Sequence, residues 1–410
     1  MDTPQFQNKK LPFLEFILII YLFALYLIPT ISMGSTTLLI LLLAYCGYLL
    51  FMDRPLANMV IGTLILIFFL AFFYALLTDA ASIAQDAGNR EIKRFISKTY
   101  QYLTFYLPAI LFVRINKTAS QKQKRWILIA GLGMMVYVII STWIYLIQHP
   151  GATKTIESFG GDAENDVANY YFIYAIPLML ATLATYAQQT TGIKKVLSWV
   201  GIVLGVIFLV NSQYTIALLI TVVGVLIQLL RSMRSKSGKI LLTFAFVVGA
   251  LFLPQILQFA ITLIPSEDVA TRLSEVLGFF TGQGMDTQNL GGRMSLYGRT
   301  VVAFFQSPIW GNRYLGFDGH ATFLTVLADT GILGGIPFYV LLCTTYKKVK
   351  SKLSQSRINY KVVLIMFVLM GLTNPIHAAM PLGLALWLLA PMTLQAIMKE
   401  DISYEKALEN

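Results

Sequence analysis

The chain of 410 residues has little charge. Asp, Glu, Lys and Arg make up 12% of it, whereas 57% of its residues are hydrophobic. A soluble domain carries about twice that charged fraction, so the surplus apolar surface needs lipid as its solvent. Histidine is scarce as well, with three residues, and the two cysteines, Cys46 and Cys343, both lie inside apolar runs. We therefore expect both thiols to behave as small buried hydrophobes.

The sequence also lacks the short motifs that identify many enzymes. It has no glycine-rich phosphate loop, no nucleotide fingerprint and no convincing Ser-His-Asp order. No group of His, Asp, Glu or Cys has the spacing of metal ligands, so we expect neither a metal nor another cofactor. Because there is no internal repeat, the sequence gives no support for an inverted-repeat transporter.

Long apolar runs dominate instead. A helix that crosses a bilayer needs about 20 mostly apolar residues, and we predict an all-α polytopic membrane protein with about twelve such spans. The first run is too long for a signal-peptide core and has no small-residue cleavage site, so it counts as a span. The predicted spans are Leu11–Ile31, Thr36–Phe51, Leu56–Leu77, Thr99–Val113, Trp126–Ile147, Ala168–Ala187, Val196–Val210, Gln213–Leu230, Ile240–Ile264, Ala321–Thr345, Val362–Leu372 and Met380–Met398.

The positions of the basic residues explain the net charge of +11. Cytoplasmic connections of membrane proteins are enriched in Lys and Arg. Twelve spans with both termini in the cytoplasm put the clusters Arg114–Arg125, Arg231–Lys239 and Lys347–Lys361 inside. The acidic loop with Glu157 and Asp166 then falls outside. Because this topology accounts for the basic bias, and no cluster carries interleaved aromatics, we expect no nucleic-acid partner.

One connection is much longer than the others. The external segment Pro265–His320 lies between spans nine and ten, and it divides the chain into residues 1–264, 265–320 and 321–410. Apolar residues recur at helical spacing within Glu267–Phe280 and again from Met294 to Phe305. This pattern predicts two amphipathic helices that rest on the outer membrane surface. Loops of this length in compact proteins are more often functional than not.

The external loop carries four arginines, Arg272, Arg293, Arg299 and Arg313. The positive-inside rule does not explain external arginines, and the planar guanidinium fork is a preferred partner of phosphate. Arg293 follows a Gly-Gly pair at the start of a predicted helix, which is a favourable seat for a phosphate. The alternative interpretation is contact with anionic lipid headgroups.

Histidine and acidic residues supply the other candidates. His320 opens the tenth span, where the helix N-terminus favours the neutral imidazole of a base. His377 lies at the outer end of span eleven, and a structural interfacial role is the alternative for it. Asp329 lies about two turns after His320; an acid inside a span costs roughly 2–3 kcal/mol unless it is solvated or paired. Asp329 either lines the same cavity as His320 or hydrogen-bonds to a neighbouring helix. Glu15, in the first span, is close enough to the cytoplasmic face for its side chain to reach water.

Three blocks in this region read Gly291-Gly-Arg-Met-Ser-Leu-Tyr-Gly-Arg, Phe304-Phe-Gln-Ser-Pro-Ile-Trp-Gly-Asn and His320-Ala-Thr-Phe-Leu-Thr-Val-Leu-Ala-Asp-Thr-Gly-Ile-Leu-Gly-Gly. Together they resemble the signature of the O-antigen ligase and Wzy-type polysaccharide polymerase superfamily. Their order and their place between spans nine and ten match the family's layout. Two residues depart from it: Gln213 stands where the family often has a diphosphate-binding arginine, and Ala321 stands where it has asparagine.

The resemblance implies a GT-C-like, metal-independent, inverting glycosyltransferase of the bacterial inner membrane. Its substrates would be undecaprenyl-diphosphate-linked oligosaccharides at the outer face. Arg293 would neutralise the diphosphate leaving group, and His320 would deprotonate or orient the acceptor hydroxyl. The other external arginines, or Gln213, would add contacts to the diphosphate. Chain-length regulators and flippases are the candidate protein partners, beside the membrane lipids.

The resemblance leaves more than one function open. A polymerase of a capsule, O-antigen or exopolysaccharide is the leading interpretation, and a ligase with a lipid A-core acceptor would use the same chemistry. A flippase or another transporter of lipid-linked oligosaccharides is the alternative from a different class. It predicts charged residues facing a cavity along several spans, whereas the informative charges here concentrate in one external loop. A purely structural membrane protein is the remaining alternative.

Overall fold

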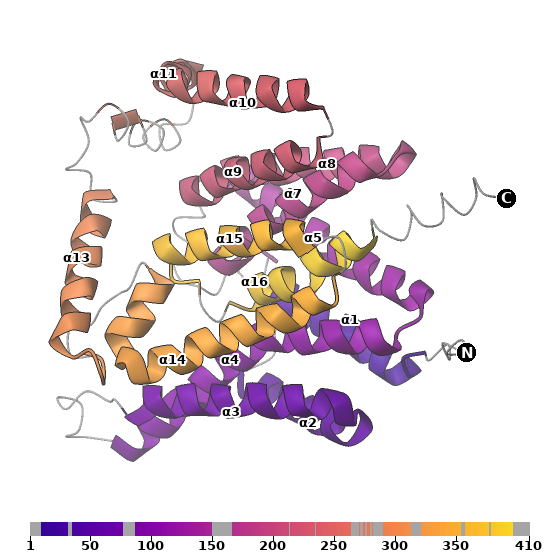
Figure 1. The fold of residues 1–410 in the computed structure, drawn as a ribbon, viewed down its shortest axis with the longest axis vertical. Helices are drawn as coiled ribbons and strands as arrows, with labels where there is room; N and C mark the ends of the chain where they lie inside the picture. The colour runs from indigo at the N-terminus through magenta and orange to yellow at the C-terminus, as the bar shows by residue number, and fades with distance from the viewer. Residues whose placement is uncertain are drawn as a thin grey trace.

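The computed structural model describes residues 10–31, 35–76, 87–149, 166–212, 214–233, 235–263, 270, 274, 277–278, 281, 290–312, 321–353, 357–376 and 379–396. Throughout this part of the chain the regular elements are helices, which confirms the predicted all-α class. Most of the helices run alongside one another in a bundle, whereas α13 lies crosswise at one end of it (Figure 1).

The helices lie on the predicted apolar runs, and several of them extend beyond the predicted ends. The elements are α1 (Phe13–Leu27), η1 (Pro29–Ile31), α2 (Ser35–Met52), α3 (Arg54–Leu76), α4 (Ala87–Thr118), α5 (Gln121–Gln148), α7 (Tyr170–Gln189), α8 (Gly192–Asn211), α9 (Thr215–Ser232), α10 (Lys236–Leu251), α11 (Leu253–Leu263), α13 (Leu290–Gln306), α14 (Thr322–Ser351), α15 (Arg357–Thr373), α16 (Met380–Leu384) and η3 (Ala385–Leu389). The second predicted amphipathic stripe of the external loop corresponds to α13.

Within the described residues, five helices are long and apolar enough to cross a membrane, namely α3, α5, α7, α8 and α14. The pair α10 and α11, bent by 60°, makes a sixth if it counts as one span. Shorter apolar helices are α1, α2, α9 and the C-terminal helix Met380–Ala396. Every predicted span coincides with a helix or with the bent pair. By length and composition the structure supports a membrane protein with five or six candidate spans, and the count of twelve stays a prediction.

The helices alternate in direction, which sorts their ends into two faces. We call one the basic face, because Lys or Arg occupies the last turns of α4, α9 and α14 there. Hydrogen bonds join chain segments on this face, from Leu11 N to Gln123 Oε1 at 3.1 Å and from Gln395 Nε2 to Lys352 O at 2.8 Å. The opposite end, the loop face, carries α13 and the first turns of α7, α9 and α14. Figure 1 shows the two faces on its right and left sides.

Aromatic rings fill the centre of the bundle. Trp387 lies in the π-helical turn η3, stacks on Tyr106 of α4 at 5.9 Å between ring centroids, and meets Phe105 edge-on at 6.1 Å. All three side chains are buried. The outer surface is apolar too, with exposed side chains such as Phe51 and Ile240. A protein that is apolar inside and outside is suited to a lipid solvent.

An ionic cluster is buried at the basic face. Arg114 of α4 makes a two-pronged contact with Glu15 of α1, from Nε to Oε1 and from Nη2 to Oε2, each at 2.9 Å. Its Nη1 reaches Asp53 Oδ2 at 3.1 Å, and Lys117 also pairs with Asp53. The Tyr45 hydroxyl donates to Glu15 Oε1 at 3.1 Å. The two cations and two carboxylates join α1, the α2–α3 connection and α4, so Glu15 is enclosed in protein where the sequence predicted contact with water.

Candidate active site on the loop face

The sequence-predicted site residues fall into two groups. Gln213, Arg272, Arg313, His320 and His377 lie outside the described residues. The rest lie on two helices. Arg293 is in the first turn of α13, although its side chain is outside the described part, and Arg299 is exposed on the same helix. Asp329 is half-buried on α14. The structure describes chain segments close to the predicted site residues Gln213, His320 and His377.

Two of the three sequence blocks contact each other directly. The turn after α13, from Ser307 to Asn312, packs its backbone against α14. Asn312 N donates to Ala328 O at 2.6 Å, and Ile332 N donates to Pro308 O at 2.8 Å. These hydrogen bonds lie on either side of Asp329 in the chain. The Ser-Pro block and the block that begins at His320 are therefore parts of one local structure on the loop face.

Two glycines make this crossing possible. Gly311 has a φ of 81°, and Gly331 has a φ of 61° inside α14, where the helix kinks. A Cβ on Gly311 would lie 2.3 Å from Asp329 O, and one on Gly331 would lie 2.3 Å from Ile309 O. Only glycine tolerates both the positive φ and the close backbone approach. At the kink, the backbone of the turn after α13 therefore packs directly against the backbone of α14, next to Asp329.

A second contact on the loop face centres on Asn374, which follows α15 and is buried. Its Oδ1 accepts hydrogen bonds from the hydroxyls of Tyr170 at 3.0 Å and Tyr174 at 2.9 Å, both on α7. Its backbone carbonyl accepts from Thr322 of α14, from Oγ1 at 2.8 Å and from N at 3.2 Å. The Tyr214 ring packs edge-on against both tyrosines, at 5.6 and 5.9 Å between ring centroids. We call these five residues the Asn374 cluster.

The Asn374 cluster brings together three segments that the sequence analysis had singled out separately. Tyr214 directly follows Gln213, and Thr322 lies two residues after His320. Ile376, whose N–H donates to Thr322 Oγ1 at 2.7 Å, directly precedes His377. Residues that lie close in the chain to Gln213, His320 and His377 thus meet at one place on the loop face, although these three positions are far apart in the sequence.

Sequence reasoning did not identify Asn374, Tyr170, Tyr174 or Thr322 as site residues. A signal was present for Asn374, because a polar amide before a proline ends an apolar run there. The tyrosines and the threonine gave none, since hydroxyl side chains inside apolar helices commonly bond to their own backbone. Their role depends on contacts with Asn374, which lies 52 positions from Thr322 and 200 positions from Tyr174 in the chain.

Asp166 fixes another part of the loop face. Its Oδ1 accepts from Thr30 N at 2.9 Å, and its Oδ2 accepts from the Tyr137 hydroxyl at 2.6 Å. Burial favours a higher pKa for the Asp166 carboxyl, but the hydrogen bonds from Thr30 and Tyr137 outweigh burial and lower the pKa below its usual value. The residue has a φ of 52°, a conformation that Asp tolerates better than most residues. The carboxylate therefore ties the segment before α7 to α5 and to the chain after α1.

A groove of about 510 Å³ opens between α11 and residues 274, 277, 278 and 281. The described residues that line it are uncharged: Pro254, Gln255, Gln258, Ser274, Leu277, Gly278 and Thr281. Amides and hydroxyls beside short apolar patches suit a neutral polyhydroxylated ligand, whereas a phosphate would need cations. This groove borders the loop that the sequence analysis predicts to be external.

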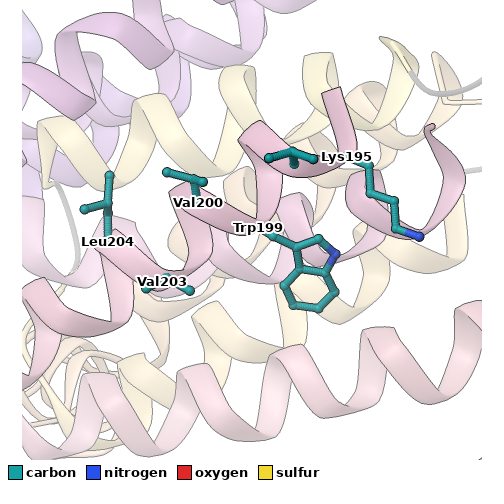
Figure 2. A pocket seen from close by; sticks show the side chains of 6 residues that line it. Lys195, Trp199, Val200, Val203 and Leu204 are labelled. Carbon is teal, nitrogen blue, oxygen red and sulfur yellow. The ribbon is translucent and has the colours of Figure 1, made fainter. Parts of the chain in front are cut away.

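A second hollow, of about 430 Å³, has a different character (Figure 2). It runs along one helix, α8, from Lys195 past Trp199 and Val200 to Val203 and Leu204. Since α8 starts at the basic face, this hollow lies toward the opposite end of the bundle from the Asn374 cluster. Its apolar lining on an outward helix face, with a Lys and a Trp near the helix start, suits contact with a lipid chain.

In the described part of the chain no three His, Cys, Asp or Glu side chains lie close enough together to hold a metal ion. In comparisons with known proteins, no family model matches the chain and no curated protein is significantly similar to it. The fold and the site therefore define a class only: an all-helical protein with several apolar helices suited to a membrane.

Proposed function

We propose that the chain is a polymerase of a bacterial surface polysaccharide. It would transfer a growing glycan from undecaprenyl diphosphate to a lipid-linked repeat unit at the outer face of the inner membrane. The proposal includes twelve spans with both termini in the cytoplasm. The single observation that carries it is the ordered series of three blocks from Gly291 to Gly335, two of which contact each other through the Gly311–Gly331 crossing.

The proposed chemistry needs two groups. The acceptor hydroxyl attacks the anomeric carbon of the donor while the bond from that carbon to the diphosphate oxygen breaks. His320 takes the proton from the acceptor, and Arg293 neutralises the charge that develops on the diphosphate. Such positioned charge stabilisation suits a leaving group that is already activated. The uncharged groove at Gln255 and Gln258 supports the proposal further, because the glycan part of the substrate presents mostly hydroxyl groups, which carry no charge.

The buried charges do not favour a transporter. Three ion pairs lie at the basic face and join Glu15, Asp53, Arg114 and Lys117 to one another. A transport pathway needs charged groups that face a cavity at several depths. A ligase with a lipid A-core acceptor would use the same two groups, and the product distinguishes it from a polymerase.

The test replaces His320 and Arg293 by alanine in the source organism or in a strain that depends on this gene. Loss of a general base costs about 10²–10⁴-fold, and loss of a charge-stabilising donor costs about 10²–10³-fold. We therefore expect long chains to vanish while single repeat units persist, as seen by size separation of the surface glycan. His149→Ala and Arg125→Ala are the matched controls, because both residues are exposed and lie far from His320 in the chain.

Normal chain length in His320→Ala and Arg293→Ala would contradict the site assignment. Polymer that is made normally but not attached to lipid A core would indicate a ligase instead. Repeat units that accumulate on the cytoplasmic side would indicate a flippase.

A further inference from the structure

We propose that Thr322 and Asn374 are positioning residues for the glycosyl transfer: together they hold the first turn of α14, and with it the backbone that leads from His320, against α7 and α15. This inference rests on the proposed function. Neither residue is assigned contact with the substrate. The observation behind it is the pair of hydrogen bonds that Thr322 makes to Asn374 O, at 2.8 Å from Oγ1 and 3.2 Å from N.

The start of α14 depends on this contact because it has no side-chain cap of its own. The N-cap residue is Ala321, whose side chain cannot accept a hydrogen bond. The first N–H groups of a helix lack partners within the helix. Here the N–H of Thr322 is satisfied by a carbonyl from the end of another helix, and Thr322 Oγ1 in turn accepts from Ile376 N at 2.7 Å.

Burial makes these bonds decisive. Thr322 and Ile376 are 0% exposed, and Asn374 is 1% exposed. Water cannot replace a partner that is lost in such a place, so an unpaired group there costs more than a hydrogen bond at the surface. The geometry of the α14 start is therefore tightly tied to the position of Asn374.

The side chain of Asn374 extends the connection to two more helices. Its Oδ1 accepts from Tyr170 and Tyr174 of α7, and the Tyr214 ring at the start of α9 packs on both. Its Nδ2 donates to Thr373 Oγ1 at 2.8 Å. Asn374 at the end of α15 thus bonds directly to the starts of α7 and α14, and the start of α9 joins them through the Tyr214 ring. A displacement of about 1 Å at a reacting group can cost about a hundredfold in rate, so this cluster sets how well the base meets the acceptor.

The experiment measures elongation of a purified lipid-linked repeat unit by the full-length protein in detergent or liposomes. Thr322→Val keeps the shape of the side chain but loses its hydroxyl, and we expect kcat to fall about 10- to 100-fold with KM within about twofold of the wild type. Thr322→Ser restores the hydroxyl and is expected to restore kcat. The double variant Tyr170→Phe/Tyr174→Phe keeps both rings, leaves the Thr322 bonds in place, and is expected to lose less.

The matched control is Thr182→Val. Thr182 is also 0% exposed, but its hydroxyl donates only within α7, to Leu178 O. Hydrogen exchange of the peptide that starts at residue 321 gives a readout without activity, and we expect it to be faster in Thr322→Val than in the wild type or in Thr182→Val. Hydrogen exchange distinguishes failure of the polymerase proposal from failure of the positioning proposal. A wild-type protein that elongates nothing would contradict the polymerase function, but the exchange rates would still test whether Thr322 holds the start of α14.

Three results would overturn the positioning role. The first is wild-type kcat in Thr322→Val together with faster exchange. The second is an equal loss of kcat in Thr182→Val, which would indicate a general effect on helix packing. The third is a loss that Thr322→Ser does not restore.

Discussion

The two faces of the bundle are held by different chemistry. At the basic face, the two cations Arg114 and Lys117 neutralise two buried carboxylates. At the loop face, the Asn374 cluster joins four helix ends with an amide, a backbone carbonyl and hydroxyls, without a charge. Loss of one partner from a buried ion pair leaves an uncompensated charge, which is costly. Neutral hydrogen bonds add no charge that would compete with a charged ligand. The comparison shows that ion pairs hold the basic face, whereas neutral hydrogen bonds join the helix ends at the Asn374 cluster.

The largest effect is expected from Arg114→Ala. This change leaves the carboxylates of Glu15 and Asp53 buried with fewer partners, and breaking a buried pair in this way costs about 3–5 kcal/mol. Thermal unfolding in detergent, with the yield of folded protein, measures the loss. Arg54→Ala is the control, since Arg54 is exposed beside Asp53 and such changes stay within about 0.5 kcal/mol. Equal stability of the two variants would mean that the ionic cluster does not hold the basic face.

A smaller effect is expected from Gly331→Ala at the loop face. The positive φ alone costs about 1–3 kcal/mol in a residue with a Cβ, and the added methyl meets Ile309 O. We expect the turn after α13 to move away from α14 and polymer formation to fall. A crosslink between cysteines placed on α13 and α14 reports the separation.

Gly133→Ala supplies the comparison for that variant, because a Cβ at this position in α5 meets nothing within 4 Å. Alanine is favoured over glycine in helices by about 1 kcal/mol, so this variant should be as stable as the wild type or more so. If Gly331→Ala behaved in the same way, the kink would not be what joins the two sequence blocks.

The smallest effect is expected from Asp166→Asn, about 1 kcal/mol at pH 7. The folded-state pKa of Asp166 lies below its unfolded value, which is about 3.9. The carboxylate therefore stabilises the fold above that unfolded pKa, and its contribution is lost as the pH falls through the folded pKa. Unfolding temperatures of both proteins from pH 7 to pH 3 should converge at the acid end. A difference that stays constant or widens there would show that the charge of Asp166 is not what matters.

Hydropathy predicted where the helices are, but not where they end. The fifth span was predicted as Trp126–Ile147, whereas α5 begins at Gln121. The difference arises because Ser120 and Gln123 form a capping box in a polar stretch that a hydropathy scale ignores. Likewise α4 extends well before Thr99, where Lys98 lies over the Tyr74 ring at 4.7 Å. Helix ends depend on caps and single contacts, which apolar patterning does not record.

The contacts that hold the two faces could not be predicted for a related reason. Arg114 belongs to a basic cluster that the positive-inside rule explains fully, so nothing marked it as the partner of Glu15, 99 positions away. Asn374 draws its partners from α7 and α14. For the candidate site, the sequence predicted the motif blocks and their order, and the structure adds that the second and third blocks touch. Pairings between distant segments require the fold itself.

The crossing at Gly331 has a consequence for how this chain can change its length. The N–H groups of Ile332 and Leu333 donate to the carbonyls of Pro308 and Ile309, so the turn after α13 supplies acceptors to the second half of α14 in a fixed register. Removing or adding one residue between Ile309 and Asn312 would change the spacing between these acceptors and the Asn312 N–H that donates to Ala328 O. We therefore expect insertions and deletions in this short stretch to disrupt the pairing with α14, although surface turns usually accept them.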